Sequence, residues 1–353
     1  MPERDAEFSM IAVAGTSREE IERALPYARV LARSSGASLA LVGLIQVPEG
    51  QSLGEGAGEA QRLRRQLEPL REGGEDIKVR VAHDPWLEAG TVLAEIGASL
   101  AFFSWSDSLP TDLLHRLPCD GVVVNGDFPP SLKRILLPIR GGPFAALSLK
   151  VALAFAQVHN AEITLLHAAP PARFRDEGFR EFFGHLQSLP EITRWVRVRG
   201  DPIKGILDNA QPDEHQLLIM GAIARPQKGD PAIGPTARRV IGETRIPALI
   251  VRTCPPAPDS PLAPPSPAVD YTISVVVDKW FAENTFAAHE FTDLKRLVEQ
   301  KERQGLTISL GLPALNEEET IGKVIKTVRR AFMERYPLVD EIVVIDSNST
   351  DKT

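Results

Sequence analysis

The sequence has few of the residues that mark specialised classes of protein. Its 353 residues include only two cysteines, Cys119 and Cys254, which lie far apart, form no metal-ligand spacing and fit a reducing compartment. A net charge of −7 argues against a general nucleic-acid binder. The apolar runs, such as VALAFA, are too short to cross a bilayer, and the amino terminus lacks an apolar signal core. We therefore expect a cytoplasmic protein with no nucleic-acid or membrane partner.

Two catalytic signatures are missing as well. The dinucleotide fingerprint G-x-G-x-x-G is absent, which argues against NAD as a ligand. The seven histidines are scattered, and none stands in a recognisable motif with a Ser or Cys nucleophile. We therefore assign no hydrolase chemistry and no catalytic residue within these 353 residues.

The sequence does contain an internal repeat. The stretch that begins at Ile11 aligns without a gap with the stretch that begins at Ile135, and each has an apolar strand, a polar turn, a helix and a second strand. Gly36 aligns with Asn160, and both residue types tolerate the left-handed geometry at the end of a helix. Such a period is too long for a solenoid, so it indicates domain duplication.

The second half of each repeat also matches. Asp84-Pro85 aligns with Asp201-Pro202, and an Asp followed by Pro is a signal for a helix start. Short apolar runs near the end of each repeat suit strands that are covered on both faces. The fold class is therefore α/β, with two duplicated parallel-sheet, Rossmann-like domains. Their predicted bounds are 8–128 and 132–253.

The second repeat contains a candidate phosphate loop between a strand and a helix. Glycines there let backbone N–H groups approach an anion, and the helix start adds partial positive charge. Its spacing resembles the universal stress protein family, whose nucleotide-binding members carry G-x2-G-x9-G-[ST]. ATP is then a possible ligand, although a structural loop is the alternative, because Ala224 replaces a Gly, Pro235 replaces Ser/Thr and Arg140 replaces an Asp. The loop residues are Gly221, Ala224, Gly234 and Thr236.

The first repeat departs further from that pattern. Ser104 stands where Gly221 does, most of the loop is missing, and Gly15 takes the acidic position after the first strand. We expect this repeat to keep the fold without a ligand. The resemblance also implies that the two repeats pack as an intrachain pseudo-dimer, or that the domains form a homodimer.

A proline-rich stretch separates the repeats from a different kind of sequence. Residues 254–270 hold seven prolines and predict an extended linker. Residues 271–306 form a lead-in with an apolar, strand-like run and a helix from Asp293 to Gln304 that Gly305 ends. We expect the aromatic side chains of the lead-in to pack in a core; they are Trp280, Phe281, Phe286 and Phe291.

The last segment, residues 307–353, predicts a strand–helix–strand unit. TISLGL reads as a buried strand, and PALNEEE reads as a turn into a helix with Asn316 as N-cap. EIVVID, from Glu341 to Asp346, reads as a second buried strand. Ligands bind at the carboxyl ends of such parallel strands.

The two motifs at those strand ends resemble the start of family 2-like glycosyltransferases with the GT-A fold. More narrowly, P-A-L-N-E-E and V-I-D-S-x-S-T-D-x-T are similar to the glucosyl-3-phosphoglycerate synthases, with Asn348 where that family usually has Gly. The resemblance implies that both motifs hold the uridine nucleotide of a UDP-sugar. By position, the nucleotide-sugar residues are Pro313, Ala314, Leu315, Glu317, Asp346 and Ser347.

The resemblance also implies parts that the sequence does not show. The family's metal-binding D-x-D and its acceptor pocket lie further along, so no metal ligand is assigned here. We expect Mg²⁺ or Mn²⁺ and a small phosphorylated or polar acceptor for a complete enzyme, and we expect this chain to be an inactive fragment of it. The alternative is a non-enzymatic stress-protein module that binds a nucleotide or a partner.

Overall fold

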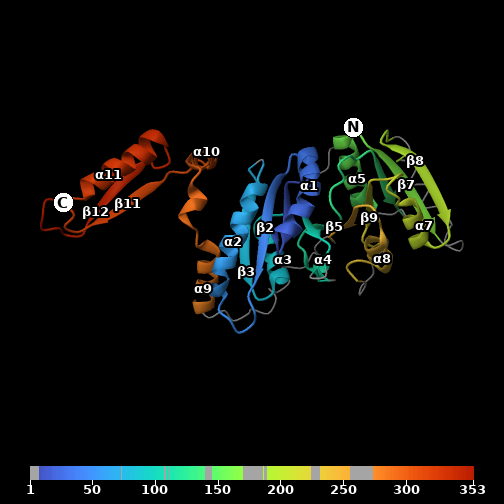
Figure 1. The fold of residues 1–353 in the computed structure, drawn as a ribbon, viewed down its shortest axis with the longest axis horizontal. Coiled ribbons are helices and arrows are strands. Elements are labelled where there is room, and N and C mark those ends of the chain that lie inside the picture. The colour runs from blue at the N-terminus through green and yellow to red at the C-terminus, as the bar shows by residue number, and fades with distance from the viewer. Residues whose placement is uncertain are drawn as a thin grey trace, which may run out of the picture. The chain divides into compact units, whose positions relative to one another are not determined.

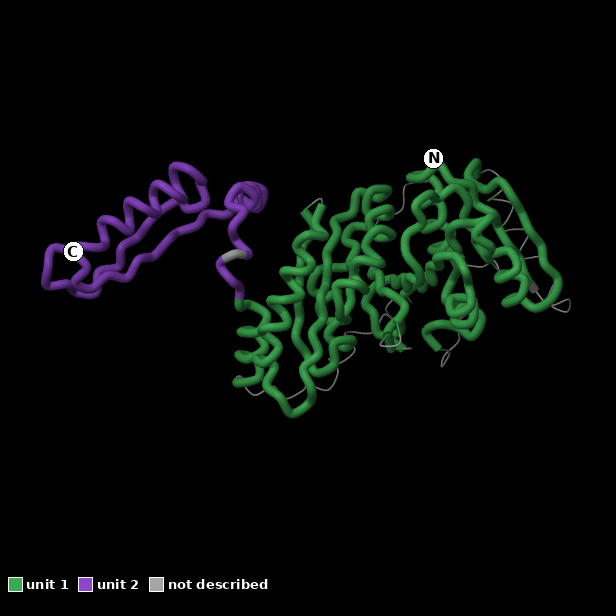
Figure 2. The backbone as a smooth tube through the Cα atoms, viewed as in Figure 1, with its two compact units in different colours: residues 1–285 green, residues 286–353 purple. Residues whose placement is uncertain are grey.

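The computed structural model describes residues 8–72, 74–106, 109–110, 112–139, 145–169, 186, 189–223, 231–254 and 273–353. The chain divides into two compact units, residues 1–285 and 286–353 (Figure 2). Most of the predicted linker, together with Arg140 and Ala224, lies outside the described residues. Each unit is described by itself.

The first unit begins with the two repeats, which have matching orders of elements (Figure 1). The first repeat contains β1 (Met10–Gly15), α1 (Arg18–Ser35), β2 (Ser38–Gln46), η1 (Leu53–Gly56), α2 (Ala57–Leu67), η2 (Glu68–Leu70), β3 (Asp76–Ala82), α3 (Pro85–Glu95), β4 (Leu100–Ser104), α4 (Leu113–Arg116) and β5 (Asp120–Asn125). The second contains β6 (Arg134–Pro138), α5 (Ala146–His159), β7 (Glu162–Ala169), β8 (Ile192–Arg199), α7 (Pro202–Asn209), β9 (Leu217–Gly221), α8 (Pro235–Glu243) and β10 (Ala248–Arg252).

The two repeats share one ten-stranded sheet. Its strand order is β3-β2-β1-β4-β5-β10-β9-β6-β7-β8, and every pair is parallel except β5 with β10 at the junction. In that antiparallel pair Val123 lies opposite Ile250. The last strands of the two repeats therefore join edge to edge in one sheet.

The sheet buries both of its faces. Phe102 and Phe103 are neighbours on β4, both fully buried, and they belong to core clusters on opposite faces. Helices α1, α2 and α5 cover one face, while α3, α4, α7 and α8 cover the other. Burying a side chain of this size contributes about 2–3 kcal/mol. Tyr27 of α1 crosses the junction, because its hydroxyl donates to the carbonyl oxygen of Gly126 at 3.2 Å and its ring lies 6.2 Å from that of Phe155.

The local signals read from the repeats are confirmed. Gly36 ends α1 with φ of 74°, and Asn160 ends α5 with φ of 51°, both in the left-handed region. The Asp84 carboxylate accepts from the backbone N–H groups of the first turn of α3. The carboxylate of Asp201 does the same at the start of α7.

The apolar, strand-like run of the lead-in is a helix, so that prediction was wrong. Helix α9 (Ile273–Asn284) packs beside α2, η1 and the edge strand β3 of the first repeat (Figure 1). The buried Arg64 guanidinium donates to the carbonyl oxygens of Glu283 at 2.9 Å and Thr285 at 3.3 Å, which satisfies the last turn of the helix. These tertiary contacts override the strand preference of the β-branched residues.

The prediction that the lead-in aromatics pack in a core was also wrong. Trp280 and Phe281 lie on α9 and are 62% and 58% exposed, while Phe286 and Phe291 are each 45% exposed. The last two rings contact each other with centroids 5.6 Å apart. The helix buries Ala282 instead, and its partly buried polar side chains bond to the first repeat.

The second unit holds a two-stranded parallel sheet. Its elements are η5 (Ala288–Phe291), α10 (Leu294–Gln304), β11 (Ser309–Ala314), α11 (Ile321–Arg329), the π-helix η6 (Arg330–Arg335) and β12 (Glu341–Asp346). Gly305 ends α10 with φ of 64°, as predicted, while the helix begins one residue later than predicted, because Asp293 is its N-cap. The strands occur as predicted but are not buried: Val343 and Ile345 are 44% and 55% exposed. A two-stranded sheet with one helix cannot cover both faces.

Candidate functional site

Strands β11 and β12 bring the two sequence motifs to one edge of their sheet. In the parallel register Pro313 lies beside Ile345 and Ala314 lies beside Asp346. The backbone N–H of Ser347 donates to the carbonyl oxygen of Ala314 at 2.9 Å, which extends the pairing past the strand ends. The loops that follow the two strands therefore start side by side.

Asn316 connects these two loops. Its side-chain Oδ1 accepts from the backbone N–H of Thr350 at 2.8 Å, and its own N–H donates to Oγ of Ser349 at 2.9 Å. The prediction that Asn316 caps the following helix was wrong, because α11 begins at Ile321 after Thr320. Asn316 has φ of 57°, a left-handed geometry that Asn tolerates, and its side chain faces the other loop.

Further hydrogen bonds continue the contact between the loops. The backbone N–H of Glu317 donates to Oγ1 of Thr353 at 2.7 Å, and that of Glu318 donates to Oδ2 of Asp351 at 3.0 Å. The Glu318 carboxylate accepts in turn from the N–H of Lys352 at 3.1 Å. Residues 316–318 and 349–353 thus form one polar rim at the carboxyl end of the sheet.

Asp346 stands at the centre of this edge. Its carboxylate accepts from the backbone N–H of Ser349 at 3.3 Å and from the Ser349 hydroxyl. Asn348 takes φ of 68°, a left-handed geometry that Asn tolerates next best after Gly. Asp346 and Ser347 are exposed, and Leu315 is 55% exposed beside them. The edge is therefore open and presents one apolar side chain next to carboxylate and hydroxyl groups.

The charge at the rim is negative. The Thr353 hydroxyl, as the largest cause, lowers the pKa of Asp351, and the backbone N–H of Glu318 adds to that effect. In the part of the chain that the structure describes, His, Cys, Asp and Glu side chains nowhere gather in threes to hold a metal ion. The residues present do not fit the divalent ion that family 2 glycosyltransferases generally use, so no chemical step is assigned to it.

The predicted phosphate loop of the second repeat is described only in part, because Ala224 lies outside the described residues. Gly221 ends β9, and the buried Gly234 precedes α8, whose first turn carries Thr236. The N–H of Gly234 donates to the carbonyl oxygen of Ala222 at 2.9 Å, and a Cβ on Gly234 would lie 3.2 Å from that same oxygen. The close approach to Ala222 explains why a glycine stands at position 234. The N–H of Gly234 binds this carbonyl oxygen within the loop.

The first repeat fills the corresponding position with its own carboxylate. Strand β1 pairs with β2 on one side and β4 on the other, so a ligand crevice is expected beyond the ends of β1 and β4. There the Glu20 carboxylate accepts from the backbone N–H of Thr16 at 2.7 Å, the Thr16 hydroxyl at 3.0 Å and the Ser106 hydroxyl at 3.0 Å. The N–H and hydroxyl groups of Thr16 and Ser106, which could bind an anion at this place, bind the Glu20 carboxylate instead.

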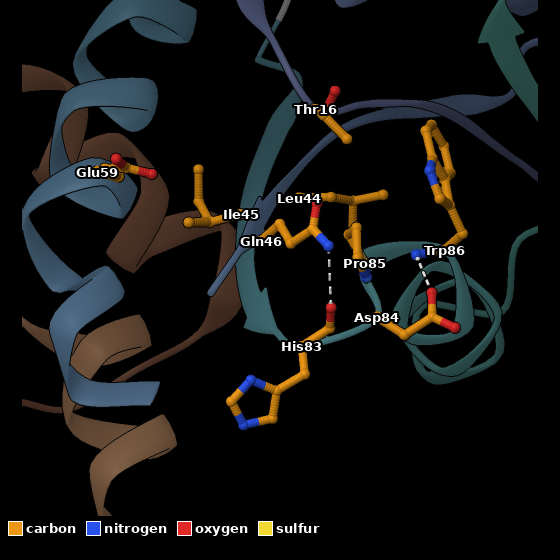
Figure 3. Close-up of a pocket in the computed structure, with 9 residues that line it drawn as sticks. All are labelled: Thr16, Leu44, Ile45, Gln46, Glu59, His83, Asp84, Pro85 and Trp86. Carbon is orange, nitrogen blue, oxygen red and sulfur yellow. Dashed lines mark hydrogen bonds between the residues drawn. The ribbon is translucent and has the colours of Figure 1, made fainter. Parts of the chain in front are cut away.

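An open pocket of about 590 Å³ lies beside that position, at the carboxyl ends of β1, β2 and β3 (Figure 3). Gln46 Nε2 donates to the carbonyl oxygen of His83 at 3.3 Å across its floor. Sequence reasoning missed this pocket, although polar residues at the ends of three neighbouring parallel strands were a usable signal. Its lining residues are Thr16, Leu44, Ile45, Gln46, Glu59, His83, Asp84, Pro85 and Trp86.

Comparison with known proteins divides the chain in the same way. Residues 309–353 match the model of the family Glycosyl transferase family 2. The chain is 51% identical over 71 residues to the glucosyl-3-phosphoglycerate synthase of Petrotoga mobilis, and the match covers 20% of this chain and 22% of that relative. The similarity to family 2 glycosyltransferases therefore lies in residues 309–353. The chain spans about a fifth of the length of that curated relative.

The repeats resemble another group of proteins. The chain is 27% identical over 135 residues to the universal stress protein in QAH/OAS sulfhydrylase 3'region of Thermus aquaticus, which covers 34% of this chain and 98% of that relative. The crystal structure of a universal stress protein from Archaeoglobus fulgidus matches with a TM-score of 0.53 at 13% identity, covering 69% of this chain and 96% of that chain. The predicted universal stress protein-like fold is confirmed.

A helix that spans a membrane must be long and apolar. None of the helices that the structure describes is both long enough and apolar enough to span a bilayer.

Proposed function

We propose that residues 309–353 hold the uridine nucleotide of a UDP-sugar in a glycosyltransferase of the glucosyl-3-phosphoglycerate synthase type. The observation that supports this proposal most is the adjacency of Ala314 and Asp346 at the carboxyl ends of neighbouring parallel strands. That edge is where α/β sheets bind nucleotides. The 51% identity to a glucosyl-3-phosphoglycerate synthase over 71 residues supports the same ligand.

In this proposal each motif has its own part. Pro313 and the exposed Leu315 provide an apolar surface against the flat uracil ring, while the buried Ala314 holds the end of β11 beside Asp346. The Asp346 carboxylate accepts a hydrogen bond from the uracil imide N–H or from a ribose hydroxyl. An ionised carboxylate only accepts hydrogen bonds, so it suits these donors. Ser347 and Glu317 flank the ribose, with the hydroxyl of Ser347 as an additional donor.

The donor, acceptor and metal follow from the resemblance. We propose UDP-glucose as donor and a small phosphorylated acid as acceptor, by analogy with the relative's name. A bound Mg²⁺ or Mn²⁺ would neutralise the leaving diphosphate, and its ligands are not among the described residues. The chain's own contribution is therefore to bind and orient the nucleotide.

The tandem repeats serve as a regulatory module in this proposal. Helix α9 supports it, because it lies in the lead-in to the glycosyltransferase region yet bonds to the first repeat. A conformational change in the repeats that breaks the contacts of α9 would detach the lead-in from the first repeat. We propose a cytoplasmic location and, beyond the intrachain pseudo-dimer, contacts between copies through the repeats.

The test is a calorimetric titration of the 353-residue chain with UDP. We expect UDP to bind and Asp346→Asn to weaken it about tenfold, since a hydrogen bond to a charged group contributes roughly 1.5–3 kcal/mol. Glu341→Gln is the matched control, because it removes a carboxylate from the amino end of the same strand and should leave UDP binding unchanged. Equal weakening by both variants, or equal binding of UDP and ATP, would refute the proposal.

A second candidate function is nucleotide binding by the repeats themselves. The likeness to a universal stress protein over 98% of its length favours it, as do the positions of Gly221 at the end of β9 and of Gly234 and Thr236 at the start of α8. Mass spectrometry of the purified chain for bound ATP, together with the melting temperature with added ATP, tests it. Thr236→Ala should abolish any ATP-induced rise while leaving UDP binding intact, so the two functions are separable.

A further inference from the structure

The two cysteines, far apart in the sequence, come together at the junction between the repeats. Strands β5 and β10 are antiparallel there, and their last paired residues are Gly121 and Arg252. Continuing this register by two residues places Cys119 directly opposite Cys254. Neither cysteine is in a disulfide.

Hydrogen bonds hold the two segments together beyond the last paired residues. The backbone N–H of Cys254 donates to Oδ1 of Asp120 at 2.8 Å, and the Cys254 thiol donates to the carbonyl oxygen of Leu117 at 3.5 Å. Leu117 and Asp120 lie on either side of Cys119 in the chain. Cys254 is therefore held against the segment that carries Cys119.

The two side chains also share a face of the sheet. Directly opposite residues in an antiparallel pair point to the same side, and residues two apart on a strand repeat that direction. Val123 and Ile250 are such an opposite pair, and both belong to the core cluster that also contains Cys119. A register extended by two residues would place the Cys254 side chain on this face as well.

This arrangement fits the geometry of a disulfide. Opposite residues of an antiparallel pair have Cα atoms about 4.5 or 5.5 Å apart. A disulfide requires a Cα separation of about 4.4–6.8 Å. A register extended to Cys119 and Cys254 would therefore bring their Cα atoms within the range that a disulfide requires.

We propose that Cys119 and Cys254 form a reversible intrachain disulfide that joins the two repeats when the cell becomes oxidising. With a peroxide as oxidant, the sulfur of the more exposed Cys254 attacks one oxygen, the O–O bond breaks, and the leaving hydroxide takes the thiol proton as water. The Cys119 sulfur then attacks the Cys254 sulfur, the S–O bond breaks, and a second water leaves with the Cys119 proton. Two thiols are oxidised, one peroxide is reduced, and a thiol reductant reverses the change.

The bond would connect two functionally different places. Cys119 precedes the last strand of the first repeat, and Cys254 is the residue at which the proline-rich stretch begins. A disulfide would enclose the whole second repeat in a covalent loop and fix the start of the linker to the first repeat. Long loops give the largest restriction of the unfolded chain.

The environment of the two thiols determines how fast they are oxidised. Burial, as the largest cause, raises the pKa of Cys119 to about 12, with Cys254 and the Asp120 carboxylate adding to it. Burial also raises the pKa of Cys254, Asp120 adds to that, and the Arg252 guanidinium opposes it. Thiolate is the reacting form, so oxidation is slow at neutral pH and requires sustained exposure. A cytoplasmic thiol pair would then stay reduced under ordinary conditions.

The test uses the full chain, purified in the reduced form and incubated with hydrogen peroxide for several hours. We expect both thiols to disappear together, the intact mass to fall by two hydrogen atoms, and digestion without reductant to give one cross-linked pair of peptides that contain Cys119 and Cys254. The rate of cross-linking should not depend on protein concentration, because the bond forms within one chain. Dithiothreitol should break the cross-link. The cross-link should raise the melting temperature by roughly 5 °C or more.

Single variants provide the controls. Cys254→Ser should keep the Cys119 thiol through the same treatment, because that side chain is 6% exposed. Cys119→Ala should oxidise at Cys254 without the intrachain cross-link; if this variant does not fold, the wild-type peptide map and Cys254→Ser decide alone. Oxidation of Cys254 alone to a sulfinic acid, cross-links only between chains, or a lower melting temperature after cross-linking would overturn the proposal.

Discussion

Lys279 on α9 lies with its Nζ 2.8 Å from Oε2 of Glu88 on α3, and the two side chains are only 22% and 10% exposed. The pair joins a helix of the lead-in to the first repeat. Ser52 adds a second bond, since its hydroxyl donates to Oδ2 of Asp278 at 2.7 Å. Glu283 adds a third, because its carboxylate accepts at 3.0 Å from the N–H of Val81 on the edge strand β3. Helix α9 thus covers a sheet edge that would otherwise present an unpaired donor.

Replacing Lys279 by Ala should loosen α9. The largely buried Glu88 carboxylate would keep only the more distant cation of Arg80, at 4.0 Å, and breaking such a partly buried pair costs about 1–3 kcal/mol. We expect amide hydrogen exchange across residues 273–284 to accelerate by about tenfold or more. Lys204→Ala is the control, since its pair with Asp208 is 76% and 62% exposed and should contribute little. Unchanged exchange in α9 would show that the pair does not hold the helix.

The docking of α9 should also depend on pH through Glu283. Burial, as the largest cause, raises the pKa of Glu283 above 4.5, while the N–H of Val81, Lys279 and Arg80 act against it and Glu88 adds to it. A raised carboxyl pKa means that the docked helix binds the proton more tightly than the free helix does. The stability from this group is therefore complete below pH 4.5 and is lost as the pH rises through the raised value.

Hydrogen exchange of α9 as a function of pH, corrected for the intrinsic exchange rate, measures this effect. Protection in the wild type should increase as the pH falls from neutral towards 5. Glu283→Gln keeps a side-chain oxygen for the Val81 N–H but has no proton to exchange, so its protection should be independent of pH in that window. A wild type that loses protection on acidification would contradict the assigned direction.

The sequence predicted the repeats well because their signals are local. A left-handed helix end at Gly36 and a helix start at Asp84 depend on residues within one turn of the chain. Helix α9 could not be read in that way. Its run Ile273–Val277 favours a strand, and the partners that fix it as a helix, Arg64 and Val81, lie about 200 residues earlier.

In the candidate site, too, some features follow from local sequence and others depend on contacts that only the fold creates. The adjacency of Ala314 and Asp346 follows from the strand–helix–strand order, so the motifs alone could predict it. The role of Asn316 could not be predicted, since its side chain bonds to Thr350, which only the folded loops bring near. A capping residue and a loop-bridging residue look identical in sequence.

The bridge made by Asn316 gives a third prediction. Both Asn316→Ala and Asn316→Gly remove the acceptor of the Thr350 N–H, so the exchange of that amide should accelerate in both. Ala additionally has to adopt φ of 57°, which costs roughly 1 kcal/mol more than for Gly. We therefore expect the Ala variant to weaken UDP binding more than the Gly variant. Equal Thr350 exchange in the wild type and both variants would refute the bridging role.

The carboxylate of Glu20 gives a fourth prediction, which concerns the crevice of the first repeat. Glu20→Ala would leave the Thr16 N–H and the hydroxyls of Thr16 and Ser106 without their common acceptor. Three donors that lose one anionic partner should cost about 1–3 kcal/mol of stability, measured by thermal unfolding. The neighbouring Glu22→Ala is the control, because Glu22 is 51% exposed and pairs only with Arg18 on the same helix among the described contacts.

The same variant also tests why this crevice has no phosphate loop. If Glu20 occupies the place of an anion, the vacated donors should accept one, and inorganic phosphate should raise the melting temperature of Glu20→Ala but not that of the wild type. Glu20→Gln should fall between them, since its amide oxygen still accepts one hydrogen bond. A phosphate effect of equal size in the wild type and in Glu20→Ala would mean that the anion binds elsewhere and that Glu20 only holds the turn after β1.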